Sequence, residues 1–148
     1  MKICNCKKSK PFKSETVLFK PKMRGRGKSQ TFQEYPVSIQ VAICENCSCF
    51  IYGKKEKDAI LRLANEARRK DLGFLTGDEI KELREKLGLS RRLFAKYLRF
   101  STRSIELWEI RNQPYEASND ELIRIKCSAP FIEMHQEEIE ALKKQKSV

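Results

Sequence analysis

The chain has 148 residues with 40% hydrophobic content, enough to build one domain or two small ones around a core. No stretch approaches the roughly 18 consecutive apolar residues of a membrane helix, and no apolar run follows the N-terminal lysines, so we expect neither a membrane span nor a signal peptide. The formal net charge of +11 favours polyanionic or acidic partners, and we expect a cytoplasmic protein whose six cysteines are not held in lasting disulfides.

The first part of the chain has the alternating pattern of β-strands. We expect one strand over residues 16–20 and another over 32–44, because Val37, Ile39 and Val41 alternate there with smaller or polar residues. The segment between them, PKMRGRGKSQ, is rich in glycine and basic residues, which is typical of a hairpin loop. The sequence therefore predicts a β-hairpin near the N-terminus.

The cations of this loop are Lys20, Lys22, Arg24, Arg26 and Lys28. They fit three roles equally well: pairing with an acidic protein surface, contacting DNA beside a recognition site, or keeping the hairpin soluble. The GRGK within the loop is not a phosphate-binding loop, because the G-x-x-x-x-G-K spacing is absent.

Cysteines lie at both ends of the predicted hairpin. Cys4 and Cys6 precede the first strand and Cys44 and Cys47 end the second, so an out-and-back hairpin brings the two pairs together. Four thiolates form the tetrahedral set of soft ligands that Zn²⁺ prefers, and we predict a structural zinc site of these four residues, with Cys49 as an alternative ligand. Free thiols that merely cluster are the alternative; a redox pair is disfavoured because no βαβ pattern surrounds the C-x-x-C.

The second part of the chain has the periodicity of helices. From Glu56 to about Lys70 apolar residues recur at helical spacing, which predicts a helical linker over 56–73. We place a zinc-ribbon-like β domain at 1–55 and a five-helix domain at 74–148. The expected fold class is therefore α+β.

Helix caps divide the helical domain. Thr76 and Glu79 form a capping box that opens a helix ending at Gly88, and Ser90 and Ser101 cap the next two helices. The second and third helices, joined by the turn at 99–101, make a helix-turn-helix. The residues spaced to share its core are Leu93, Leu98, Phe100, Ile105 and Trp108.

Two more helices are predicted after the helix-turn-helix. Ser118 and Glu121 open the fourth, and Pro130 suits the first turn of the fifth. The fifth helix is one candidate surface for dimerisation, and its apolar residues at helical spacing include Ile132, Ile139 and Leu142.

The segment LSRRLFAKYLRFSTRSIELWE at 89–109 resembles the phage-repressor (XRE) type of helix-turn-helix, with Ala95 in the small-residue position and Trp108-Glu109 at the end of the pattern. With the cysteine pairs and the lead-in FLTGDEIKELREKLGLS, the whole layout resembles the MqsA (YgiT-type) zinc-finger antitoxins of toxin-antitoxin systems. It departs from the common pattern at the C-x-C pair, at Arg99 where the turn usually has glycine, and at Ile110-Arg111 where Asn-Gly usually ends the helix.

The resemblance implies the antitoxin of a type II toxin-antitoxin system. Such a protein is a homodimer that neutralises a cognate toxin, commonly an RNase, by protein binding and represses its own operon by binding operator double-stranded DNA. By the same pattern Arg103 occupies a base-reading position, and Leu107 occupies one that is commonly polar.

The residues themselves predict how DNA would be read. The third helix turns one face away from Ile105 and Trp108, and on that face Arg103 can donate to a guanine edge. Arg91 and Arg92 stand at a helix N-terminus, where phosphate binds well. The predicted DNA-binding set is Arg91, Arg92, Arg99, Ser101, Thr102, Arg103, Glu106, Leu107 and Arg111.

The net charge is +8 for residues 1–56, +5 for 57–114 and −2 for 115–148. The C-terminal segment is therefore the poorest candidate for contact with nucleic acid. A stand-alone transcriptional regulator and an RNA-binding or ribosome-associated zinc-ribbon protein are the alternatives, the latter with Phe19, Phe32 and Tyr35 as stacking faces. We do not expect an enzyme, because an all-sulfur zinc site has no open position and no carboxylate pair or nucleophile-base pair stands out.

Overall fold

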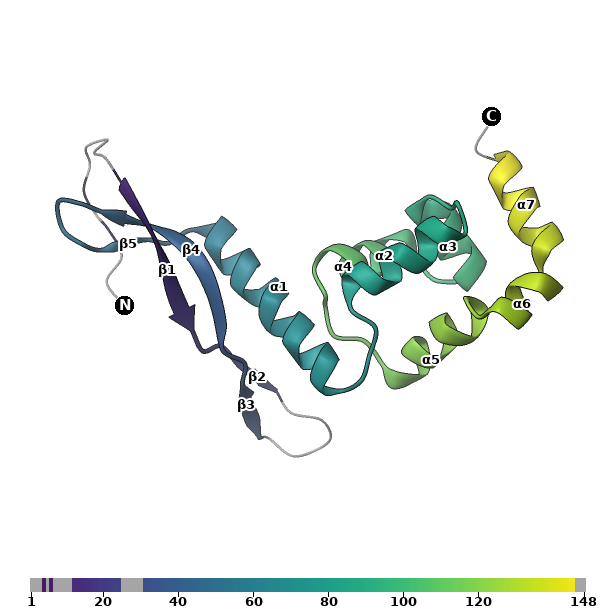
Figure 1. The fold of residues 1–148 in the computed structure, drawn as a ribbon, viewed down its shortest axis with the longest axis horizontal. Coiled ribbons are helices and arrows are strands. Elements are labelled where there is room, and N and C mark those ends of the chain that lie inside the picture. The colour runs from purple at the N-terminus through teal and green to yellow at the C-terminus, as the bar shows by residue number, and fades with distance from the viewer. Residues whose placement is uncertain (1–3, 5, 7–11, 25–30, 146–148) are drawn as a thin grey trace. The chain divides into compact units, whose positions relative to one another are not determined.

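The computed structural model describes Cys4, Cys6 and residues 12–24 and 31–145, so the loop residues Arg26 and Lys28 lie outside the described part of the chain. These residues form two units, one ending at Ala67 and the other starting at Arg68. The first contains all five strands of the described chain, and the second is helical (Figure 1). The predicted α+β class is confirmed. Among the described residues, no helix has the length and apolar character that crossing a bilayer demands.

The first unit is built on an antiparallel sheet ordered β1-β4-β5, and β2 and β3 form a separate two-stranded ribbon (Figure 1). The strands are β1 (Phe12–Phe19), β2 (Lys22–Arg24), β3 (Phe32–Glu34), β4 (Val37–Cys44) and β5 (Phe50–Ile51). The strand predicted over 32–44 is thus two strands, which part at Tyr35-Pro36. Proline has no N–H to donate to a ladder, so the pairing changes from one sheet to the other at this point.

Helix α1 (Lys54–Asp71) covers one face of the sheet through Ile60 and Ala64. The alternation predicted for β4 is confirmed, because Val37, Ile39 and Val41 are buried and the residues between them are not. The segment predicted as a linker therefore supplies part of the core of the first unit, which extends to Ala67.

The second unit contains six helices in the described residues, against five predicted. They are α2 (Gly77–Lys86), α3 (Arg91–Leu98), α4 (Thr102–Ile110), α5 (Ala117–Lys126), α6 (Ala129–Met134) and α7 (Gln136–Lys144). The last predicted helix is divided at His135, whose φ of −118° and ψ of 22° lie outside the helical range. Its N–H closes α6 by donating to the carbonyls of Phe131 and Ile132.

The predicted caps of the first three helices are confirmed. The Thr76 N–H donates to Glu79 Oε2 at 2.7 Å and the Glu79 N–H donates to Thr76 Oγ1 at 3.3 Å, which completes the capping box. Ser90 Oγ accepts from the Leu93 N–H, and Ser101 Oγ accepts from the Ser104 N–H. These bonds satisfy helix N–H groups that have no partner within the helix.

The fourth predicted cap is wrong. Helix α5 begins at Ala117, one residue before the expected cap, and Ser118 lies inside the helix. The residue at the cap position is Glu116, whose side chain makes no capping hydrogen bond. A serine followed by a glutamate three residues later predicts the start of a helix only if the serine side chain makes the capping hydrogen bond, and here it does not cap the helix.

The core of the second unit contains Leu93, Leu98, Ile105 and Trp108, as predicted. Phe100 packs edge-on against Trp108, with ring centroids 5.0 Å apart. The same core includes Ile139 and Leu142, and Ile132 packs against it. Ile139 and Leu142 are buried in their own unit and Ile132 is partly buried against it, so most of the apolar surface named as one candidate for dimerisation is already covered.

Candidate functional site

The strands of the first unit bring four thiols together. The Sγ atoms of Cys4, Cys6, Cys44 and Cys47 all lie within 4.8 Å of one another, and those of Cys4 and Cys47 are 3.6 Å apart. Bonds of about 2.3 Å from sulfur to a tetrahedral Zn²⁺ imply edges of about 3.8 Å between sulfurs. All four cysteines are free thiols. The donor set and its spacing therefore fit a metal ion, as predicted.

The turn after β4 shapes the half of this site that contains Cys44 and Cys47. Cys44 is 1% exposed, and its carbonyl accepts from the Ser48 N–H at 2.7 Å. Ser48 takes up the left-handed conformation, with φ of 53°, that lets the chain wrap around the sulfur. The N–H groups of Cys47 and Asn46 donate to the Cys44 sulfur and lower its pKa to about 7, although burial acts in the opposite direction.

The other half of the site contains Cys4 and Cys6. The Cys6 N–H points to Cys4 Sγ at 3.5 Å, which lowers the pKa of Cys4, but burial and the neighbouring thiols outweigh this bond and raise it to about 12. Adjacent thiolates repel one another, so the four sulfurs ionise together only around a positive ion. The Cys4 N–H donates to the Phe50 carbonyl, which fixes this end of the chain to β5.

The remaining cysteines lie outside the cluster. Cys49 Sγ donates to the carbonyl of Cys47 at 3.3 Å and is not among the four clustered thiols. Burial raises the pKa of Cys127, in the second unit, to about 12, which suits an inert structural thiol. Asn46, which sequence reasoning missed, places its Nδ2 3.7 Å from Cys6 Sγ.

In the second unit, α3 and α4 present most of the residues predicted to meet DNA. Arg103 projects from α4 with its side chain 67% exposed, and its contact with Glu106 is a surface ion pair of 3.6 Å. Leu107 departs from the prediction, because it is half-buried and packs against the core beside Trp108. Its helical position is only about 100° from that of Trp108, so one side of it faces inward.

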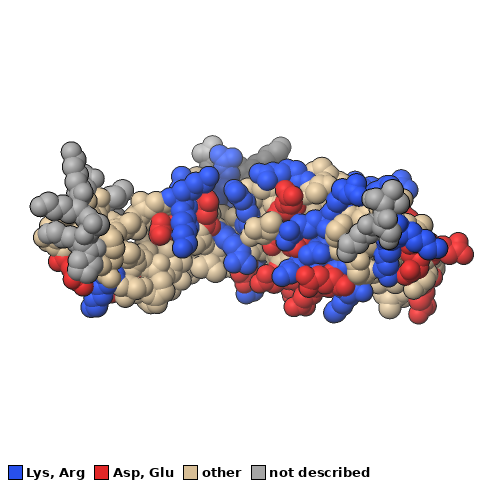
Figure 2. Space-filling model, turned by 90° about the horizontal axis from the view of Figure 1, so that it is seen from above, with Lys and Arg blue, Asp and Glu red and all other residues tan. Residues whose placement is uncertain are grey.

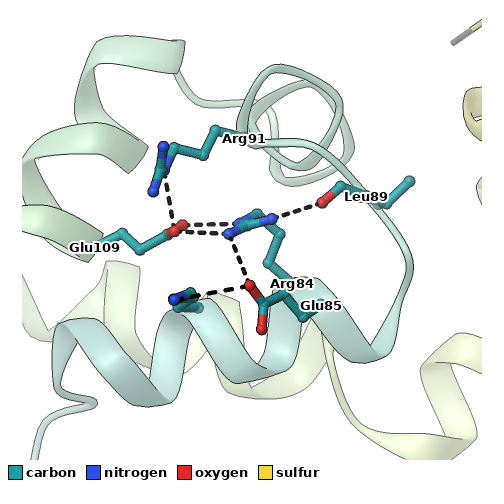
Figure 3. A network of polar contacts seen from close by, with 6 residues as sticks. Arg84, Glu85, Leu89, Arg91 and Glu109 are labelled. Atoms are coloured by element: carbon teal, nitrogen blue, oxygen red, sulfur yellow. Dashed lines mark hydrogen bonds and ion pairs between the residues drawn. The ribbon is translucent and has the colours of Figure 1, made fainter.

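A buried carboxylate ties three helices together at this surface (Figure 3). Glu109 of α4 has a side chain only 1% exposed and accepts two bonds from Arg84 of α2, at 2.9 and 2.8 Å. The same carboxylate accepts from Nε of Arg91 at 3.0 Å. The sequence predicts that Arg91 contacts phosphate; in the structure its Nε donates to Glu109, while its side chain remains 41% exposed.

Sequence reasoning missed the pairing of Arg84 with Glu109. Arg84 is 11% exposed in its side chain and donates a further bond to the Leu89 carbonyl at 2.9 Å. The hydrogen bond with Glu109 raises the pKa of Arg84. The signal in the sequence is an acidic residue directly after Trp108, a core position, because a buried acid requires a basic partner.

An open cavity of about 730 Å³ lies between α2, α3 and α4. Its lining residues are Lys81, Arg84, Glu85, Gly88, Leu89, Ser90, Arg91, Arg92, Thr102 and Glu106. Four predicted DNA-binding residues thus meet around one hollow. Figure 2 shows acidic side chains interspersed with basic ones over much of the face it presents, so DNA binding would depend on individual cations rather than on one uniform patch.

The turn between α3 and α4 accounts for the second of the three departures, Arg99 in place of glycine. Arg99 has φ of 63°, the left-handed conformation that usually requires glycine. The N–H groups of Arg99 and Phe100 donate to the carbonyls of Lys96 and Ala95, which is the hydrogen-bond pattern of a Schellman helix end. The turn keeps its geometry with an exposed arginine in place of glycine.

The end of α4 accounts for the third departure, Ile110-Arg111 in place of Asn-Gly. Helix α4 ends at Ile110, Arg111 follows it on the surface, and Asn112 is left-handed with φ of 50°. Asn112 is 1% exposed, and its Oδ1 accepts from the N–H of Gly77. The left-handed residue that closes the helix is therefore Asn112.

The buried Arg69 holds the same end of α4. It is 2% exposed, donates to the carbonyls of Trp108 at 2.9 Å and Gln113, and lies 4.5 Å from the centre of the Tyr115 ring. Burial lowers its pKa to about 10, although Tyr115 and a nearby aspartate raise it. A cation at helix carbonyls is favourable, and this one fixes α4 from its C-terminal end.

A buried carboxylate also secures the start of α2. Asp120 accepts from the Leu75 N–H at 2.7 Å, from the Tyr115 hydroxyl at 2.6 Å and from Arg124 Nε at 2.7 Å. Burial by itself would raise its pKa, but the bonds from Arg124, Tyr115 and Leu75 outweigh burial and lower it. Arg124 is the i+4 neighbour of Asp120, a pair that helical spacing can predict, but Leu75 lies 45 residues from Asp120 and no local pattern predicts that bond.

The chain thus holds two sites with different chemistry. The first unit offers four sulfur donors whose spacing fits a metal ion, and the second offers an exposed arginine on α4 and a cavity whose lining contains four basic and two acidic residues. Comparison with profiles of known protein families gives no match, and neither curated proteins nor solved structures show one.

Proposed function

We propose that the protein is the antitoxin of a type II toxin-antitoxin system, which binds its operator as a sequence-specific dimer and neutralises a toxin by protein binding. The observation that carries the proposal is Arg103, 67% exposed on a helix that Glu109 and Arg69 hold rigidly in place. A base-reading side chain must project from a fixed element, because a misplaced donor loses its hydrogen bonds.

In this function α4 lies in the major groove of the operator. Arg103 donates to the O6 and N7 atoms of a guanine, and Thr102, at the first position of α4, contacts the adjacent base. Arg92 and the exposed part of Arg91 bind phosphates at the edge of the cavity. Arg99 and Arg111, both exposed, add further backbone contacts.

The metal of the first unit is Zn²⁺ in this proposal. Cys4, Cys6, Cys44 and Cys47 would hold it, and a closed set of four sulfurs supplies structure rather than catalysis. The sheet it would stabilise has a small core, so the free energy of metal binding adds directly to the stability of the fold.

The face of the sheet turned away from α1 suits the toxin. On β1 this face consists of Phe12, Ser14, Thr16 and Leu18, none of which is charged, although charged residues make up 34% of the chain. Phe12 is 49% and Leu18 57% exposed. An exposed, uncharged face with apolar side chains is typical of protein interfaces.

The alternative of an RNA-binding zinc ribbon loses support from burial. Of the three aromatic residues predicted as stacking faces, Phe19 is 7% and Tyr35 8% exposed, and only Phe32 remains open at 61%. Single-stranded RNA is bound by successive bases stacked on several rings. A stand-alone transcriptional regulator shares the DNA-binding site and differs only in having no toxin partner.

The test is a titration of the full, metal-loaded chain with duplex DNA from its own promoter and with a scrambled duplex of equal length. Arg103→Ala is expected to cost about 1–3 kcal/mol on the promoter and little on the scrambled duplex. Lys144→Ala, which removes one charge from the exposed face of α7, is the control and is expected to retain the preference. Equal binding of both duplexes by wild type would overturn the proposal.

A further inference from the structure

The β2–β3 ribbon of the first unit has two unlike faces. Met23, in the middle of β2, is partly buried and packs against the core of the unit. Its neighbours Lys22 and Arg24 are exposed, so they project from the opposite face. That outer face shares no residue with the cysteine cluster or with the predicted recognition helix α4.

The outer face combines positive charge with one aromatic ring. Arg24 lies directly opposite Phe32 in the ladder, and Lys22 lies opposite Glu34. Phe32 is 61% exposed, and the contact between Lys22 and Glu34 is a loose ion pair of 3.9 Å between exposed groups. Lys20, also exposed, adds a third cation beside the ribbon. Positive charge therefore exceeds negative charge here.

We propose that this ribbon face is a second DNA-contacting surface, in which Lys22 and Arg24 bind phosphates and Phe32 packs against a sugar or a thymine methyl group. The inference rests on the proposed function, because it adds a contact to the same protein–DNA complex. A two-stranded ribbon is one of the two elements that the major groove admits, and apolar side chains contact the thymine methyl there.

Two other partners fit the face less well. An RNA strand would need several open rings, and Phe32 is the one ring of the three predicted stacking residues that is open. An acidic protein surface would match the cations, but the uncharged face of β1 already offers the first unit an apolar surface for protein binding. Duplex DNA uses both the cations and the single ring.

The experiment compares salt dependence of DNA binding in the full chain. Lys22→Ala/Arg24→Ala removes two phosphate contacts from each protomer, so the slope of log K against log salt should become shallower by about 1.8 per protomer, or about 3.6 for the dimer, with affinity some tens of fold lower per protomer at about 0.1 M salt. The control Lys54→Ala/Lys57→Ala removes the same charge from exposed positions of α1 and should keep the wild-type slope. Phe32→Ala should weaken binding without changing the slope.

The proposal is overturned if the ribbon variant keeps the slope of the control, or if its only defect is in binding RNA or the toxin. Failure of the proposed function is a separate outcome, since it shows as equal binding of promoter and scrambled duplexes by wild type. In that case the ribbon variant still reports on phosphate contacts, because these contacts do not depend on sequence.

Discussion

Replacing Glu109 by glutamine tests the network that fixes α4. Glutamine keeps the shape of the side chain but has one acceptor oxygen and places an NH₂ group against the donors of Arg84. Arg84, 11% exposed in its side chain, then loses its buried counter-charge. Arg91, at 41% exposure, loses a partner that water replaces at little cost.

The size of the effect follows from these exposures. Removing one partner of a buried ion pair costs about 3–5 kcal/mol. Arg84 retains its bond to the Leu89 carbonyl and lies 3.6 Å from Glu85, so we expect the lower end, about 3 kcal/mol in the free energy of unfolding. For a unit of this size that corresponds to a fall in Tm of about 15 °C.

Urea unfolding followed by tryptophan fluorescence measures this change. Trp108 is the only tryptophan in the chain, and it is 8% exposed in the core of the second unit, so its signal reports on that unit. In the double variant Arg84→Met/Glu109→Leu both charges are absent, and most of the lost stability should return. A Glu109→Gln variant within about 1 kcal/mol of wild type, or a double variant less stable than the single one, would refute the reasoning.

Three further predictions concern stability. In Gly77→Ala the new Cβ would overlap the Glu109 carbonyl and lie 2.9 Å from that of Trp108, so urea unfolding should show a loss of about 2–3 kcal/mol; unchanged stability would contradict this packing. Because its hydrogen bonds lower the pKa of Asp120, this carboxylate stabilises the fold above its ordinary pKa of about 4, and the contribution disappears as pH falls through the lowered value. Asp120→Asn should therefore be less stable at neutral pH by about 1–3 kcal/mol and lose less stability than wild type on acidification in urea titrations; parallel pH profiles would argue against it. Chelation of the metal should reduce the strand signal in circular dichroism while leaving the Trp108 transition in place, and Cys47→Ser should bind less Zn²⁺ than Cys49→Ser; equal metal content in both variants would remove Cys47 from the ligand set.

Features that depend on neighbouring residues could be predicted from the sequence. Ser90 and Ser101 were recognised as caps because a cap bonds to an N–H three residues away. The cysteine cluster was predictable because an antiparallel hairpin necessarily returns to its starting end, as the pairing of Phe12 with Cys44 shows.

Features that depend on the folded chain were missed. Arg69 reaches the carbonyl of Trp108, 39 residues away, and Arg84 reaches Glu109, 25 residues away. The acid directly after Trp108 indicates that Glu109 needs a basic partner, but no local pattern identifies which arginine meets which group. The division of the last helix at His135 was also missed, since no proline or glycine stands there. Leu107 was placed on the open face because its spacing alone does not show how far the core extends around α4.

In the part of the chain that the structure describes, the two hydrophobic cores have no residue in common. Cooperative unfolding spreads through shared packing, so we expect each core to unfold as a unit of its own, with α1 as the element that runs through both units. The losses of unfolding free energy caused by one substitution in each core should therefore add, with no further interaction between them. Destabilising substitutions in a library of random variants would then fall into two classes, one for each core. A selection for the function of one unit would not remove destabilising substitutions in the other unit.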